Sequence, residues 1–104
     1  SILRQEANLI LDKVAADLRN YPASKIRIAA YTDATHDADA NRELSFRRAK
    51  TVEQYLARTL GNQHRWLVIG YGETHPLTAH DTDTTANQQR NRRIEIAVNS
   101  ISTP

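Results

Sequence analysis

The sequence predicts an α+β domain in which a small mixed sheet carries helices on one face. Two stretches place apolar residues at helical spacing, and three short stretches show strand patterns. The length of 104 residues fits one domain, here residues 1–104, and the hydrophobic fraction of 39% is enough for a modest core. The patterns follow the order helix, strand, helix, strand, long polar connection, strand. A strand, a helix and a strand in series favour a parallel pair of strands.

The first helix is predicted from an apolar stripe. It is expected to end at Tyr21-Pro22, because proline disfavours a helical conformation in the residue before it. Its apolar residues are Leu3, Ala7, Ile10, Leu11, Val14 and Leu18. Lys25–Tyr31 then alternates, which predicts a half-buried strand. The side chains expected to face one way are Ile26, Ile28 and Ala30. Residues 32–40 are polar and acidic, and they predict a loop.

The second helix is predicted over residues 41–60, with the Asn41 side chain as its N-terminal cap and Gly61 as its stop. Its apolar stripe consists of Leu44, Val52, Tyr55, Leu56 and Leu60. The apolar run 66–69 is continuous, which predicts a strand covered on both faces.

The rest of the chain predicts a polar connection and one more strand. Residues 73–91 are polar and leave room for one short helical turn. Residues 94–98 alternate, with Ile94, Ile96 and Val98 on one side, and predict the last strand. The tail, residues 100–104, is expected to be loose.

Composition argues against several functions. The chain has no cysteine, so disulfides and thiolate metal sites are excluded. No apolar run reaches the roughly 18 residues of a membrane span, so any membrane attachment would belong to a parent protein. A net charge of +2 is low for a nucleic-acid-binding face. The four histidines lack metal-site spacing, and no nucleophile–base pair or phosphate loop suggests an enzyme.

An alternating acidic segment resembles a calcium loop only in part. Its oxygen-bearing residues are Asp37, Asp39, Asn41 and Glu43. The positions that need Gly and Glu hold Arg42 and Arg48 instead. These acids are therefore expected to keep the loop solvated.

An acid and an arginine suggest a binding site. Asp33 follows a strand, and Arg48 lies two turns into the next helix, so the two side chains can converge across a cleft. Asp33 would hold an ammonium group and Arg48 would bind a carboxylate with two parallel N–H bonds. Free N–H groups at the helix start would add a second anion site. The predicted ligand is a small amino acid or a peptide end.

Three sequence blocks resemble the signature of the OmpA-like peptidoglycan-binding domain family. The first block comprises Thr32-Asp33, Asn41, Leu44-Ser45 and Arg48-Ala49. The second comprises Gly70-Tyr71-Gly72-Glu73 with Pro76. The third is Asn91-Arg92-Arg93-Ile94-Glu95-Ile96. The blocks occur in the family's order with matching gaps and extend over most of the chain.

The resemblance implies a βαβ-type sandwich that binds peptidoglycan non-covalently, without a cofactor or metal. Its ligand would be the diaminopimelate residue of the stem peptide, in the periplasm of a Gram-negative bacterium, and the domain would anchor a membrane protein or complex. Asp33 and Arg48 would hold the ligand's amine and carboxylate. The other ligand-binding positions implied are Thr32, Asn41, Leu44 and Arg92. A homodimer or assembly within an envelope complex is also implied.

The sequence departs from the family's pattern at several places. Ala30-Tyr31 precedes Thr32, His36 stands where Gly is frequent, and Asn87-Gln88 replaces a Gly-Arg pair. The family's first strand, which precedes the first helix, is not found in this sequence. The Asn87-Gln88 replacement suggests an alternative function, a scaffold with weakened or lost ligand binding that serves as a protein-interaction or assembly domain of a secretion or motor complex. A nucleic-acid module, suggested by Arg90 and its neighbours, ranks third.

Overall fold

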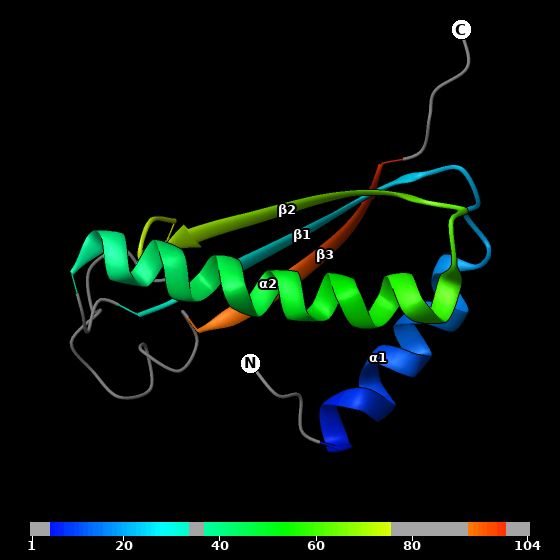
Figure 1. Cartoon of the computed structure of the whole chain (residues 1–104), viewed down its shortest axis with the longest axis horizontal. Helices are drawn as coiled ribbons and strands as arrows, with labels where there is room; N and C mark the ends of the chain where they lie inside the picture. The colour runs from blue at the N-terminus through cyan, green and yellow to red at the C-terminus, as the bar shows by residue number, and fades with distance from the viewer. Residues whose placement is uncertain (1–4, 34–36, 76–91, 100–104) are drawn as a thin grey trace, which may run out of the picture.

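Two helices cover one face of a three-stranded sheet (Figure 1). The computed structural model describes residues 5–33, 37–75 and 92–99. Their elements are, in order, α1 (Gln5–Leu18), β1 (Lys25–Tyr31), α2 (Ala38–Leu60), β2 (Arg65–Gly72) and β3 (Arg93–Asn99). The strand order is β2-β1-β3, with β2 parallel and β3 antiparallel to β1. This arrangement confirms the predicted α+β class, the small mixed sheet and the parallel β1–β2 pair.

The central strand β1 is buried on both faces rather than on one. Ile26 and Ile28 are fully buried in the core beneath the helices. Ala29 and Tyr31, on the opposite face, are also buried. The reason is position, because β1 has a neighbouring strand on each side and their side chains flank it. The prediction of a half-buried strand was therefore wrong for its second half.

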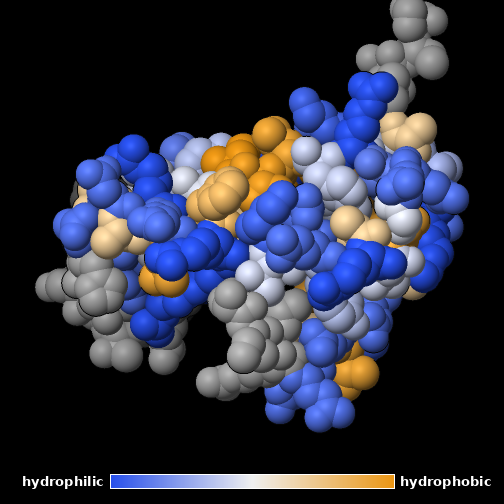
Figure 2. Space-filling view, in the orientation of Figure 1, coloured by the Kyte–Doolittle hydropathy of each residue, from blue (hydrophilic) through white to orange (hydrophobic). Residues whose placement is uncertain are grey.

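The strand β2 is longer and more exposed than the apolar run 66–69 predicted. It lies at an edge of the three described strands, and Leu67 is 37% exposed. Only Trp66 and Val68 pack against the core, so the predicted cover on both faces was wrong. Figure 2 shows hydrophobic residues gathered above α2, along β2, on a face that is otherwise largely hydrophilic.

The core joins both helices to one face of the sheet, and α1 contributes less than its sequence stripe predicted. Leu11, Ala15 and Leu18 are buried in this core. Ile10 is 63% exposed and borders an apolar groove of about 380 Å³. Its neighbours in this groove are Ala7, Leu11, Val14, Val52, Ile94 and Ile96. The apolar stripe of α1 is thus wider than the surface that α2 and the sheet offer it.

Several predicted features lie outside the described residues. They comprise most of the polar connection 73–91, the tail 100–104, His36 and the Asn87-Gln88 pair. None of the described helices is long and apolar enough to cross a membrane.

Candidate ligand-binding site

Asp33 is a buried carboxylate that is paired with Arg92. It follows the C-terminal end of β1 by two residues, and Arg92 directly precedes β3 (Arg93–Asn99), which runs antiparallel to β1. Arg92 Nη1 donates a hydrogen bond of 3.0 Å to Asp33 Oδ2. The side chain of Asp33 is 4% exposed, whereas that of Arg92 is 44% exposed. Because a buried charge is costly without a partner, Arg92 offsets part of the cost of burying the Asp33 carboxylate.

Arg48 lies on α2 and lines a pocket of about 320 Å³. The other described lining residues are Tyr31, Arg92, Arg93 and Ile94. The nearby acids are engaged elsewhere, since Glu43 pairs with Arg47 at 3.8 Å and Glu53 with Lys50 at 3.2 Å. Arg48 forms no ion pair with any residue in the described part of the chain. The pocket therefore presents a guanidinium group that is free to bind an anion.

Arg93 is fixed in place by three neighbours. Its guanidinium carbon lies 3.7 Å from the centre of the Tyr31 ring, and its Nε donates a 2.8 Å hydrogen bond to Glu95 Oε2. Its Nη2 donates to the backbone oxygen of His75 at 3.1 Å. Tyr31 stacks on Tyr71 with ring centres 5.1 Å apart and donates its hydroxyl to Glu95 Oε1 at 3.1 Å. Arg93 thus forms a rigid wall of the pocket.

The electrostatics of this wall appear in two pKa shifts. The hydrogen bond from Arg93 lowers the pKa of Glu95 below its ordinary value. Burial, followed by the hydrogen bond to Glu95, raises the pKa of Tyr31 above its ordinary value. Glu95 is therefore a carboxylate at neutral pH, and it neutralises Arg93 without needing a ligand.

The sequence of the chain matches the profile of the OmpA family over residues 1–92. The chain belongs to the OmpA family. It is 32% identical to outer membrane porin F of Pseudomonas fluorescens over 98 residues. This alignment covers 94% of this chain and 29% of the porin. It is 37% identical to the peptidoglycan-binding protein ArfA of Mycobacterium bovis over 91 residues. That alignment covers 86% of this chain and 27% of ArfA. The chain thus spans less than a third of either relative.

A solved structure shares the OmpA-family fold seen here. The cell wall anchor of the T6SS from Pseudomonas aeruginosa superposes with a TM-score of 0.77 at 28% sequence identity. The match covers 90% of this chain and 66% of that anchor. The family resemblance found in the three sequence blocks is thereby confirmed.

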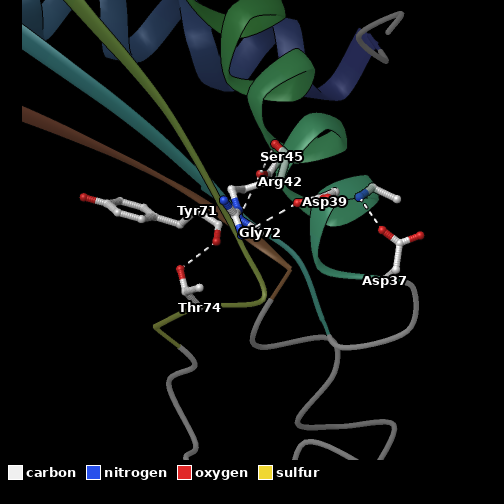
Figure 3. A network of polar contacts seen from close by, with 8 residues as sticks. Asp37, Asp39, Arg42, Ser45, Tyr71, Gly72 and Thr74 are labelled. Atoms are coloured by element: carbon white, nitrogen blue, oxygen red, sulfur yellow. Dashed lines mark hydrogen bonds and ion pairs between the residues drawn. The ribbon is translucent and has the colours of Figure 1, made fainter.

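The start of α2, which carries part of the OmpA-family motif, has a different N-terminal cap from the one predicted (Figure 3). Asp37, not Asn41, caps the helix, because its Oδ1 accepts a hydrogen bond from the Ala40 N–H at 2.9 Å. Asn41 lies within the helix and is buried, with its N–H bonded to the Asp37 backbone oxygen. The predicted Asn41 cap was wrong, since an acid four residues earlier starts the helix at Ala38.

Ser45 connects α2 to the end of β2, a role that sequence analysis missed. Its Oγ donates to the Arg42 backbone oxygen at 2.9 Å and accepts from the Gly72 N–H at 2.9 Å (Figure 3). Both Ser45 and Gly72 are buried. Ser45 stood out in the sequence as part of the family motif, but its hydrogen-bond partner at the end of β2 could not be identified before the fold was known.

The six residues predicted to bind ligand do not all meet in one place. Arg48 and Arg92 line the pocket together, and Asp33 is joined to it through Arg92. Thr32 is buried, its N–H donates to the Gly72 backbone oxygen at 2.8 Å, and its hydroxyl oxygen has no hydrogen-bond partner among the described residues. Asn41 is buried, and half-buried Leu44 is not among the described lining residues.

No metal centre is formed by the described residues. Ranges 5–33, 37–75 and 92–99 contain no group of three or more His, Asp or Glu side chains placed to share a metal ion. The described charged groups of the site are the guanidinium groups of Arg48, Arg92 and Arg93, with the carboxylates of Asp33 and Glu95 beside them.

Proposed function

We propose that this chain binds peptidoglycan non-covalently and anchors a larger protein to the cell wall. The observation that carries the proposal is the pocket itself, in which Arg48 has no ion-pair partner among the described residues and Arg92 bridges to buried Asp33. The family, together with the similarity to a peptidoglycan-binding protein and to a cell wall anchor, supports peptidoglycan as the ligand.

The ligand of this pocket would be the diaminopimelate residue of the stem peptide. The free end of its side chain carries an ammonium group and a carboxylate on one carbon atom, which is the charge pattern that a carboxylate and a guanidinium can both engage. Arg48 would bind the carboxylate through two parallel N–H bonds, and Asp33 would bind the ammonium group. Each such charge-assisted hydrogen bond is worth about 1.5–3 kcal/mol.

Three further residues complete the proposed site. The buried Thr32 hydroxyl, which has no partner among the described residues, would accept or donate a hydrogen bond at the ligand's amine end. The backbone of Asn41 and Leu44, at the start of α2, would lie beside the ligand. Their positions in the family motif support this part of the proposal.

The place of action that we propose is the cell envelope, in the periplasm. The similarity to an outer membrane porin supports this location. Because the chain spans 29% of that porin, the membrane attachment and the protein that is anchored would lie in the rest of a longer parent protein. A homodimer remains a prediction of the sequence.

Co-sedimentation with purified sacculi tests the proposal. Arg48→Gln and Asp33→Asn should each reduce the bound fraction at least tenfold, because each removes a charged partner worth about 1.5–3 kcal/mol. Arg47→Gln is the matched control for Arg48→Gln, since Arg47 is 63% exposed on the same helix and its replacement changes the net charge by the same amount. Retention of full binding by both site variants, with circular dichroism showing intact folds, would refute the proposal.

One observation favours the alternative of a scaffold without ligand binding. Arg92 already pairs with Asp33, so an ammonium group would have to share this carboxylate with a guanidinium group of the chain itself. Titration with a diaminopimelate-containing stem tripeptide separates the two functions. If the amide resonances of Thr32, Asp33 and Arg48 do not move at millimolar peptide, the chain is a protein-interaction domain instead.

A further inference from the structure

The strand β2 forms an open edge of the sheet in the described part of the chain. It pairs with β1 on one side, and only its last residue is buried. The Arg65 N–H donates to the Ser24 backbone oxygen, which fixes the side of β2 that faces β1. Because the backbone groups of successive residues in a strand point to opposite sides, those of Trp66, Val68 and Gly70 point away from β1. In the described residues these groups have no hydrogen-bond partner, so they can pair with another strand.

Two exposed apolar side chains flank this edge. Leu67 alternates with Trp66 and Val68, which pack against the core, so it lies on the sheet face away from the helices, where it is 37% exposed. On the other face, Phe46 of α2 is 45% exposed, and its backbone nitrogen lies against Gly70. Figure 2 shows hydrophobic residues gathered along β2. A strand added at this edge would cover apolar surface on both faces.

The edge of β2 lacks the devices that usually protect an unpaired strand, which are lysine, proline, a bulge or an inward-pointing charge. Its only charged residue, Arg65, stands at its start and is followed by the apolar run 66–69. The irregularity in its register with β1 lies at the far end, at Tyr31. By contrast β3, at the other edge of the described strands, carries Arg93 and Glu95. Of the two edges, β2 is therefore the one suited to pairing.

A second copy of this chain does not fit the edge. The backbones of α2 and β2 are in contact at Gly70, so α2 crosses directly over the strand. Antiparallel pairing of two β2 strands would place both α2 helices on one face, roughly one strand spacing of 5 Å apart. Packed helices need about 8–10 Å between their axes. The occupant that fits is an extended segment with no helix above it.

The charges near the start of β2 indicate what this segment carries. Lys25 and Arg65 lie opposite each other in the β1–β2 register, and both are exposed. Neither forms an ion pair with an acid in the described part of the chain. Because like charges on neighbouring strands repel, acidic side chains placed beside them would be attracted.

We propose that the edge of β2 binds an extended segment of a partner protein. The segment has apolar residues at alternate positions and acidic residues at the end that lies beside Arg65, and it adds a fourth strand to the described sheet. This surface is separate from the candidate ligand-binding site. Arg48 follows Phe46 by two residues on α2, and that spacing turns the two side chains to nearly opposite flanks of the helix. A peptidoglycan ligand and a partner strand can therefore be bound together.

Nuclear magnetic resonance with a synthetic peptide tests the proposal. The peptide alternates valine and threonine over the length of β2 and ends in two glutamates, which antiparallel pairing places at the start of β2. Binding should slow amide hydrogen exchange at least tenfold at Trp66, Val68 and Gly70. Exchange at Leu67 and Ile69 should stay the same, because their N–H groups already bond to β1. The same peptide, N-methylated on the amides that face β2, should bind at least tenfold more weakly, since it cannot donate to the edge.

Two variants and a control locate the surface. Arg65→Glu and Leu67→Gln should each weaken peptide binding several-fold, the first through charge and the second through lost apolar contact. Leu9→Gln is the matched control for Leu67→Gln, since Leu9 is 62% exposed on α1. Circular dichroism checks that each variant is folded.

Several outcomes would overturn the proposal. These are the absence of binding at millimolar peptide, equal binding of the N-methylated peptide, and slowed exchange that does not alternate along β2. A dimer in sedimentation equilibrium that Leu67→Gln dissociates would show that a second copy covers the edge. Binding to phosphatidylglycerol vesicles in place of the peptide would show that the surface meets a membrane. Either result would also contradict a partner strand.

Discussion

Substitution of Gly70 by alanine should destabilise the domain strongly, because α2 crosses β2 at this glycine with almost no space between the backbones. A β-carbon on Gly70 would lie 2.4 Å from the Phe46 backbone nitrogen and 2.7 Å from the Arg42 backbone oxygen. Ordinary contacts start at 3.4 Å, so α2 would have to retreat by about 1 Å. Both obstructing atoms belong to the backbone and cannot rotate away.

The expected cost lies at the upper end of the range for overpacking, about 3 kcal/mol. For a domain of this size, that cost lowers the midpoint of thermal unfolding by about 10–20 °C. Gly61→Ala serves as a comparison without a steric clash, because Gly61 has open space around it and its cost comes only from its backbone conformation, with φ 75° and ψ −146°. That conformation is essentially restricted to glycine and costs an alanine about 1–3 kcal/mol.

Urea unfolding followed by circular dichroism measures both variants. Gly70→Ala should lose about 3 kcal/mol of free energy of unfolding, whereas the loss in Gly61→Ala reports a backbone conformation alone. If Gly70→Ala loses less than about 1 kcal/mol, then α2 can move away from β2 freely. In that case the close approach does not fix the helix that carries Arg48.

Two further predictions concern residues near the site. Ser45→Ala should cost about 1–3 kcal/mol in urea unfolding, because the buried Gly72 N–H loses its acceptor; Thr51→Ala, at an exposed hydroxyl on the same helix, should cost less, and equal losses would contradict the argument. Stability should also fall at both ends of the pH scale. The pKa of Glu95 is lowered by Arg93, so its contribution is complete above pH 4.5 and is lost as the pH falls through the lowered pKa. The pKa of Tyr31 is raised by burial, so its contribution is complete below pH 10.0 and is lost as the pH rises through the raised pKa. Urea midpoints across the acidic range should depend less on pH in Glu95→Gln; an identical acid limb would refute the Glu95 part.

The sequence predicted the elements of the fold better than their surroundings. Helical and alternating periods depend on neighbours within one element, so Lys25–Tyr31 and the class of the fold could be predicted. The exposure of a residue depends on which elements pack beside it. Ile10 fits the helical stripe but is 63% exposed, and Leu67 lies in an apolar run but on an edge strand. Periodicity carries no information about such neighbours.

The candidate site shows the same limit. The family motif singled out Asp33, Arg48 and Arg92, but the contact between Arg92 and Asp33 joins residues 59 positions apart. The stacking of Arg93 on Tyr31 arises because the antiparallel register of β1 and β3 places these two residues opposite each other. A local pattern does not specify that register, so the rigid wall of the pocket could not be predicted.

The spacing of the motif residues along α2 places one set on the face that packs against the sheet and another set on the flank that carries Arg48. Asn41, Ser45 and Ala49 lie four residues apart along one face of α2, and all three are buried. Ser45 and Ala49 are small, and on this side α2 comes close enough for Ser45 to reach the end of β2. Leu44 and Arg48, also four residues apart, lie on the neighbouring flank and are half-buried. Arg48 is therefore carried to the pocket by a face that the packing fixes, so a change at Ser45 should alter ligand affinity through the position of Arg48, without touching the ligand.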